Sequence, residues 1–172
     1  MAGPREVYSR EVIAARVTEL GGRISSDYAG KELVLVGILK GSTVFLADLL
    51  RTLSGSVRFE LVNVTRHGEP NGEVIELAYA TRVHLEGADA LIIKDICHSG
   101  VTEHYLLTHL SQQRPASLEV AALVDKPQLR RVNLEPRYVA FNQVPEGRLV
   151  GYGMEFDGRW GNLPGLCLLE GE

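Results

Sequence analysis

Two short apolar runs, each followed by a glycine-containing turn and a helix-like segment, constrain the fold more than any other feature. Residues 33–39 read Leu-Val-Leu-Val-Gly-Ile-Leu, and residues 90–93 read Ala-Leu-Ile-Ile. Apolar runs without polar alternation are typical of strands that are covered on both faces in a parallel sheet. The segments that follow, 44–53 and 106–110, carry apolar residues at helical spacing. The sequence therefore predicts an open α/β sheet.

Other segments supply the remaining elements of such a sheet. Ser9 is predicted to cap a helix in which Ile13, Val17, Leu20 and Ile24 share one buried face. Further strands are predicted at residues 57–61, 73–80, 118–124, 138–141 and 149–152. Between the first two of these lies a polar segment, 65–72, which is either a hairpin connection or a mobile lid over a site. The sequence leaves both interpretations open.

Length and composition exclude several classes of protein. The 172 residues fit one compact domain, so we predict a single domain over residues 1–172. Hydrophobic residues make up 45% and charged residues 23%, as in ordinary globular proteins. The formal net charge of -4 argues against nucleic acid or an anionic membrane as a partner. Cys97 and Cys167 are too few for a disulfide framework, and a reducing cytoplasm is the predicted compartment.

The segment 94–102 is the most informative for function. In open α/β sheets, ligands bind beyond the carboxyl ends of the strands, where the N–H groups of the next helix hold an anion. Ser99 and Thr102 offer hydroxyls, Gly100 allows close backbone approach, and Asp95 can accept hydrogen bonds from a sugar or hold metal-bound water. This set is typical of a phosphate-and-ribose cradle. A plain helix N-cap formed by Ser99 explains the spacing equally well.

The same segment resembles the phosphoribosyl pyrophosphate loop of type I phosphoribosyltransferases. Residues 90–102 share its order: a hydrophobic strand, an acidic residue, two apolar residues, a polar residue, Ser, Gly, any residue and Thr. Three other regions resemble the hypoxanthine-guanine branch of that family: the first loop and helix (36–42 and 47–49), the purine-recognition segment (123–127 with Arg130 and Arg131), and the C-terminal hood (150–155 and 162–164). The similarity runs in order from about Tyr8 to Leu169.

The resemblance implies both a fold and an activity. The implied fold is a central, mostly parallel sheet flanked by helices, with a small hood formed mainly by about residues 140–172 together with the N-terminal segment. The implied activity is transfer of 5-phosphoribosyl from phosphoribosyl pyrophosphate to a 6-oxopurine, hypoxanthine or guanine, in nucleotide salvage. The implied cofactor is Mg²⁺ on the donor, and the implied assembly is a homodimer or homotetramer.

The resemblance also assigns roles to individual residues. His98 and Asp95 take the catalytic positions. Phosphate and ribose are expected to contact two loops, through Lys40, Gly41, Asp95, His98, Ser99, Gly100, Val101 and Thr102. The purine is expected to contact Lys126, Arg148, Leu149 and Glu155. Arg66 and His67 occupy the lid, and Asp95 and Glu155 are the candidate metal ligands.

This sequence departs from the family pattern at several of these positions. Lys94 replaces the first of two carboxylates, so that only Asp95 remains of the acidic pair. His98 stands in place of the aspartate that handles the purine proton, and a neutral imidazole can accept a proton near pH 7. The other departures are Arg66-His67 for Ser-Tyr, Arg148 for an aromatic ring, Glu155 for aspartate and Gly161 for arginine.

These changes leave more than one functional interpretation open. Changes of sign beside a diphosphate cost several kcal/mol when nothing compensates them, so activity is expected to be retuned, weak or lost. The first interpretation is a divergent purine phosphoribosyltransferase. The alternative is a non-catalytic purine-nucleotide-binding or regulatory protein on the same fold. Within the first, Lys94 and Arg66 could also replace charge that magnesium or the missing arginine provides.

Overall fold

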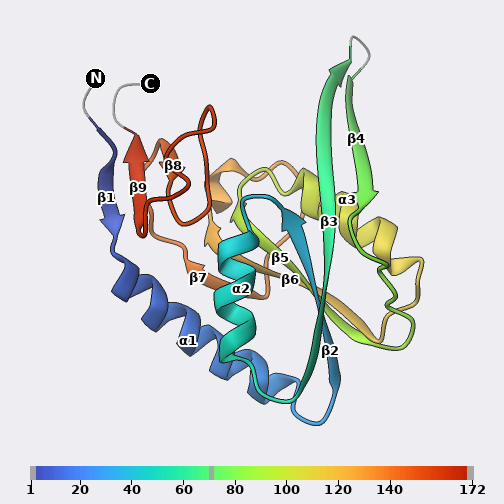
Figure 1. Ribbon diagram of the computed structural model, residues 1–172. Helices are drawn as coiled ribbons and strands as arrows, with labels where there is room; N and C mark the ends of the chain where they lie inside the picture. Colours follow the sequence, from blue (N-terminus) through green and yellow to red (C-terminus); the bar gives the residue numbers. More distant parts are fainter. Residues whose placement is uncertain (1–2, 70–71, 170–172) are drawn as a thin grey trace.

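A six-stranded sheet forms the centre of the molecule (Figure 1). The computed structural model describes residues 3–69 and 72–169, with the side chains of 66–69 and 72–74 outside that description. The strand order is β4-β3-β2-β5-β6-β7, and every neighbouring pair is parallel except β3 and β4. The strands are β2 (Glu32–Leu39), β3 (Ser56–Glu69), β4 (Gly72–Tyr79), β5 (Asp89–Cys97), β6 (Ser117–Asp125) and β7 (Tyr138–Phe141). The predicted mostly parallel α/β sheet is confirmed.

Three α-helices cover the two faces of this sheet: α1 (Arg10–Asp27), α2 (Thr43–Thr52) and α3 (Val101–Ser111). Alternate residues of β2 point to opposite faces, as in any strand. Leu33 and Leu35 pack in the core cluster that holds the buried residues of α1 and α2. Val34 and Val36 pack in a second cluster with Leu106 of α3. Burial on both sides explains why the strand reads as a continuous apolar run.

The predicted helix after Ser9 is confirmed in detail. The Ser9 side chain accepts a hydrogen bond from the Val12 N–H at 3.4 Å. The buried residues of α1 include all four that the spacing placed on one face: Ile13, Val17, Leu20 and Ile24. Packing of this face against the sheet, more than the cap, stabilises the helix, because each buried aliphatic side chain contributes roughly 1.5–3 kcal/mol.

The polar segment 65–72 is mostly strand rather than loop. β3 continues to Glu69 and β4 begins at Gly72, and their antiparallel register runs from the pair Val62–Tyr79 to the pair Glu69–Gly72. Backbone pairing along the ladder outweighs the weak strand preference of the polar side chains. The described residues of this segment therefore belong to the two arms of a hairpin, which extends beyond the neighbouring strands (Figure 1), and the lid role stays a prediction.

A smaller antiparallel sheet joins the two ends of the chain. It contains β1 (Arg5–Tyr8), β9 (Leu166–Leu169) and β8 (Arg148–Val150), in that order. The strand predicted at 149–152 ends two residues early, because Gly151 and Tyr152 have φ angles of 90° and 51° and leave the extended conformation. The Tyr8 ring stacks on Phe141 with centroids 4.2 Å apart and connects this sheet to β7. Among the described helices, none is both long and apolar enough to cross a membrane.

Candidate functional site

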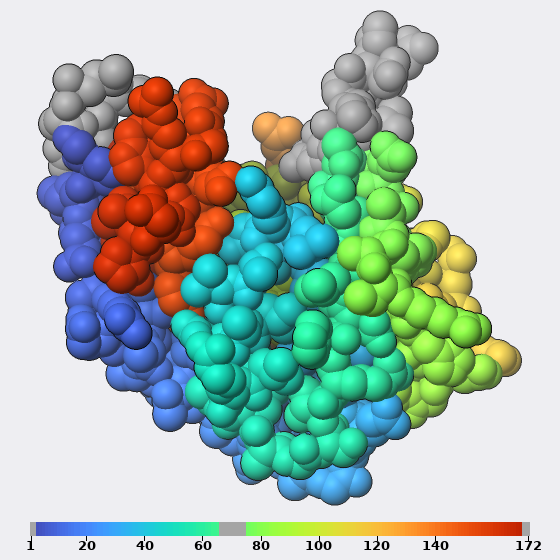
Figure 2. All heavy atoms as spheres, viewed as in Figure 1, coloured from blue at the N-terminus to red at the C-terminus, as the bar shows by residue number. Residues whose placement is uncertain are grey.

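The main cavity, of about 700 Å³, lies at the carboxyl ends of β2, β5 and β6. Figure 2 shows the molecule hollowed between the smaller sheet and the β3–β4 hairpin. The cavity brings together residues that are more than 100 positions apart in the sequence. Eight of the predicted site residues line it: Lys40, Gly41, Asp95, His98, Lys126, Arg148, Leu149 and Glu155.

Of the remaining residues of the predicted phosphate loop, Ser99 and Gly100 connect β5 to α3, and Val101 and Thr102 begin the helix. Gly100 has a φ of 76° and is the N-cap of α3, so the interpretation of Ser99 as the N-cap is wrong by one residue. The left-handed turn at Gly100 moves the helix start past Ser99, whose Oγ instead accepts a hydrogen bond from the Val101 N–H at 3.4 Å. Ser99 and Thr102 are buried at 8% and 9% exposure, beside the cavity rather than on its lining.

Arg130 holds this loop against the end of β6. Its Nη1 donates to Cys97 Sγ at 2.8 Å and to the His98 carbonyl oxygen at 2.9 Å, and its Nη2 pairs with Asp125. A Cβ atom at Gly100 would lie 2.9 Å from the Arg130 Cδ, so the side chain crosses directly over the glycine. From the sequence, Arg130 is expected only as part of the segment that resembles the purine-recognition region, and its contacts with the phosphate loop are not predicted.

On the wall of the cavity, Lys94 lies between two carboxylates. Its Nζ is 2.7 Å from Asp95 Oδ1 and 4.0 Å from Glu103 Oε1. Burial on its own would lower the pKa of Lys94, but the two carboxylates outweigh it and raise the pKa above its ordinary value. Glu103, on the first turn of α3, is only 2% exposed and was not singled out from the sequence. A carboxylate that deep in the fold requires a nearby cation, and Lys94 provides it.

Across the cavity, Lys40 and Glu155 form a second pair. Lys40 Nζ donates to Glu155 Oε2 at 2.6 Å. The Glu155 side chain lies over Gly161, where a Cβ would be 2.7 Å from Glu155 Cγ. Gly41, the neighbour of Lys40, packs even more closely on the other carboxylate, since an added Cβ would be 2.0 Å from Asp95 Oδ2. The Lys40-Gly41 loop thus lies between both acidic residues of the cavity.

The predicted purine contacts lie at the other end of the cavity. Lys126 is 6% exposed and its Nζ donates to the Gly147 carbonyl oxygen at 2.8 Å. Burial lowers the pKa of Lys126, and the nearby Glu146 opposes this effect. The Arg148 guanidinium lies 4.3 Å from the centroid of the Phe156 ring, in stacking range. Leu149 is buried beside it and supplies apolar surface.

The two candidate metal ligands do not form a metal site with the side chains around them. Asp95 is paired with Lys94 and Glu155 with Lys40. Among the described side chains, which leave out those of residues 66–69 and 72–74, no three from His, Cys, Asp or Glu are grouped so as to hold a metal ion. A divalent cation on either carboxylate would be repelled by the adjacent ammonium group. The carboxylates present therefore do not fit Mg²⁺ as a protein-bound ion.

The predicted lid residues, Arg66 and His67, belong to strand β3, and their side chains are outside the described part.

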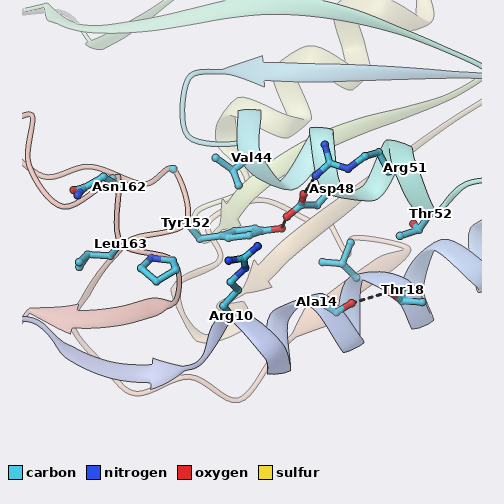
Figure 3. Close-up of a pocket in the computed structure, with 14 residues that line it drawn as sticks. Arg10, Ala14, Thr18, Val44, Asp48, Arg51, Thr52, Tyr152, Asn162 and Leu163 are labelled. Atoms are coloured by element: carbon cyan, nitrogen blue, oxygen red, sulfur yellow. Dashed lines mark hydrogen bonds and ion pairs between the residues drawn. The ribbon is translucent and has the colours of Figure 1, made fainter.

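A second cavity, of about 560 Å³, lies between α1, α2 and the loop that follows β8 (Figure 3). The Tyr152 ring points across it toward α2, and its hydroxyl donates to Asp48 Oδ2 at 2.6 Å. Burial and this hydrogen bond raise the pKa of Tyr152. The contact anchors the turn at residues 151–153, whose Gly153 lines both cavities. The contact between Tyr152 and Asp48 therefore holds in place a turn that forms part of the wall of the main cavity.

Comparison with known proteins agrees with this arrangement. The family model described as phosphoribosyl transferase domain matches residues 5–157. A hypoxanthine-guanine phosphoribosyltransferase of Dictyostelium discoideum is 37% identical, with 96% of this chain and 95% of that protein covered. One from Streptococcus agalactiae is 33% identical over 96% of this chain and 93% of its own.

The fold comparison leads to the same family. A crystal structure of a hypoxanthine-guanine phosphoribosyltransferase from Bacillus anthracis superposes with a TM-score of 0.91 at 32% sequence identity. The superposition covers 98% of this chain and 99% of that one. The chain belongs to the type I phosphoribosyltransferase family, in its hypoxanthine-guanine branch.

Proposed function

We propose that this chain transfers the 5-phosphoribosyl group of phosphoribosyl pyrophosphate to a 6-oxopurine, hypoxanthine or guanine, in purine nucleotide salvage. The observation that carries the proposal is the convergence of Lys40, Asp95, His98 and Lys126 on one cavity at the carboxyl ends of parallel strands. These side chains match, in type and placement, the needs of a sugar phosphate at one end and an oxopurine at the other.

In the proposed reaction, a purine ring nitrogen attacks C1 of the ribose. The C1–O bond to diphosphate breaks, and its electron pair leaves with the diphosphate. The purine then carries a surplus proton on its five-membered ring, which the His98 imidazole accepts. Lys40 binds the departing diphosphate, and Asp95 accepts hydrogen bonds from ribose hydroxyls. Fixing the donor and base in one cavity supplies most of the rate enhancement, because charge develops between groups that are already oriented.

The base is selected by Lys126 and its surroundings. One Lys126 N–H bond goes to the Gly147 carbonyl, and the ammonium group has two further hydrogens to offer a 6-oxo oxygen. A 6-aminopurine would present a donor to this donor and would leave a buried charge unpaired. We infer that Leu149 and Arg148 cover one face of the base, and that Ser99 to Thr102 receive the 5-phosphate.

The test is nucleotide formation from hypoxanthine, guanine and xanthine with the phosphoribosyl donor, with adenine as the control base. Turnover of at least one oxopurine, absent with adenine, is expected. If a calorimetric titration shows that a purine nucleotide binds but none of the bases is turned over, the non-catalytic nucleotide-binding alternative replaces this proposal. Absence of both turnover and nucleotide binding in folded protein contradicts both.

We further propose a homodimer or homotetramer in the cytoplasm, built from one domain over residues 1–172 in which the smaller sheet acts as the hood. The shared core supports the single domain, since Leu149 and Leu166 of the smaller sheet pack in one cluster with Leu35 of the central sheet. The two described cysteines are buried free thiols, which suits a reducing compartment. Sedimentation equilibrium gives the assembly, and a purely monomeric mass would contradict it.

A further inference from the structure

The main cavity carries its own positive charge. Four of its lining side chains are cationic, Lys40, Lys94, Lys126 and Arg148, and two are carboxylates, which leaves a net charge of +2 without His98. The buried Glu103 carboxylate beside Lys94 reduces this charge to +1. The whole chain has a formal charge of -4, so the cationic groups are concentrated here. A sugar bearing a phosphate and a diphosphate is strongly anionic. A cavity of this charge attracts it without an added cation.

Lys94 is the cation of that cavity that the structure places against two carboxylates. Its side chain is 19% exposed, against 73% for Lys40, and it is held from two sides by Asp95 and Glu103. Glu103 is 2% exposed, and its Oε1 makes no hydrogen bond among the described residues. The only cation near this oxygen in the described ion pairs is Lys94 Nζ, at 4.0 Å. Glu103 therefore fixes the ammonium group from below while Asp95 fixes it from the cavity side.

Lys94 stands where the resemblance implies the first carboxylate of an acidic pair. Lys94 precedes Asp95 at the carboxyl end of β5, and its Nζ lies 2.7 Å from the Asp95 carboxylate. An ammonium group at that distance occupies the space in which a metal ion would contact Asp95 Oδ1. The other oxygen, Asp95 Oδ2, packs against Gly41. The other candidate ligand, Glu155, is occupied by Lys40. The chain thus replaces metal ligands with an internal cation.

We propose that the Lys94 ammonium group is a built-in cation for the phosphoribosyl donor, so that donor binding to this chain does not require a divalent metal. Lys94 contacts the donor at its ribose-diphosphate end, and Glu103 is the positioning residue that holds Lys94 there. This inference rests on the proposed function for the identity of the donor. It concerns binding, however, and so it can be tested without turnover.

The experiment is calorimetric titration of phosphoribosyl pyrophosphate into the folded protein, in Mg²⁺ and in EDTA. For the unmodified chain, we expect the Kd in EDTA to stay within about threefold of the Kd in Mg²⁺, because Lys94 already supplies the charge. Lys94→Gln should weaken binding in EDTA by about tenfold or more, as expected for loss of a charge-assisted contact. Lys31→Gln, which removes a lysine paired with Asp89 away from the cavity, should change neither value.

A second variant protects the test against misfolding. Lys94→Gln leaves Glu103 buried without a cation, whereas Lys94→Gln with Glu103→Gln removes both charges together. The double variant should fold and should still bind the donor at least about tenfold more weakly in EDTA than the unmodified chain. Binding by the unmodified chain that is lost in EDTA, or equal Kd values for the unmodified chain and the double variant in EDTA, would overturn the proposal. Metal-independent donor binding without turnover would refute the proposed function alone, and turnover with strictly metal-dependent binding would refute this inference alone.

Discussion

Lys40 Nζ and Glu155 Oε2 lie 2.6 Å apart, joined across the mouth of the main cavity from positions 115 residues apart in the chain. Glu155 reaches Lys40 because Gly161 has no side chain in its way. The longer acid at 155, the glycine at 161 and the lysine at 40 therefore act as one arrangement. Two of the departures from the family pattern, Glu155 and Gly161, compensate each other.

Gly161→Ala tests this compensation through stability. The added methyl group would lie 2.7 Å from Glu155 Cγ, so we expect a loss of about 1 kcal/mol, the low end for overpacking, because the Glu155 side chain can move. Combining it with Glu155→Ala should remove the loss. The matched control is Gly22→Ala on α1, where nothing lies within 4 Å, and which should stabilise by about 0.5–1 kcal/mol. Urea unfolding measures these three variants, the single Glu155→Ala variant and the unmodified chain, and additive effects at 155 and 161 would contradict the arrangement.

Lys94→Met tests the buried ion pair. It leaves the Glu103 carboxylate in the core without a cation, and we expect a loss of about 3 kcal/mol, the low end for breaking a buried pair because Lys94 keeps 19% exposure. Lys94→Met with Glu103→Met replaces the pair by apolar volume and should recover most of that loss. Urea midpoints measure both. A double variant as unstable as the single one would show that Glu103 is not held by Lys94.

Arg130→Ala tests the clamp on the phosphate loop. The change leaves the buried Asp125 without its partner and frees the loop at Cys97 and His98, so a loss of about 3 kcal/mol is expected. The neighbouring Arg131→Ala, at an exposed side chain, should stay within about 0.5 kcal/mol. Arg130→Lys should fall between them, because an ammonium group cannot reproduce the planar, multi-donor contacts of a guanidinium. Equal stability of the two alanine variants would refute the clamp.

The Cys97 thiol predicts how stability changes in alkaline solution. Burial and, to a smaller extent, Glu103 raise its pKa to about 12, with Arg130 opposing. An unfolded cysteine titrates near pH 8.5, so above about that pH the unfolded chain releases a proton that the folded chain keeps. The free energy of unfolding should therefore fall as pH rises, by up to about 1.4 kcal/mol per pH unit from this group. For Cys97→Ser, the free energy of unfolding should decline less steeply between about pH 8.5 and about pH 10.5. Parallel curves for the variant and the unmodified chain would contradict the raised pKa of Cys97.

Local patterns in the sequence predict the fold well. The buried face of α1 and the buried strand β2 can be predicted from the sequence, because burial imposes a helical or a continuous apolar pattern on neighbouring residues. The length of the β3–β4 hairpin could not be predicted from the sequence. Backbone pairing between the two strands keeps polar residues such as Thr65 in strand conformation, although their composition favours a loop. The start of α3 moved by one residue for a similar reason, since the left-handed turn at Gly100 depends on the path of the chain.

The candidate site is predictable only in part. Resemblance named eight residues that do line the cavity, because loops at the carboxyl ends of parallel strands converge wherever this fold forms. It did not identify Glu103, and it placed Arg130 in the purine-recognition segment without its contacts to the phosphate loop. The roles of both residues depend on their partners in the fold: Lys94 for the first, Cys97 and Asp125 for the second. Charge compensation between distant positions leaves no periodic signal in one sequence.

The central claim is that this cationic cavity still performs phosphoribosyl transfer. Phosphorus NMR of phosphoribosyl pyrophosphate mixed with guanine and a stoichiometric amount of protein, in Mg²⁺, tests it most directly, because even a single slow turnover is seen. We expect the donor resonances to give way to those of a nucleoside monophosphate and free diphosphate. Unchanged donor resonances in the presence of folded protein, with guanine, hypoxanthine and xanthine alike, would contradict it.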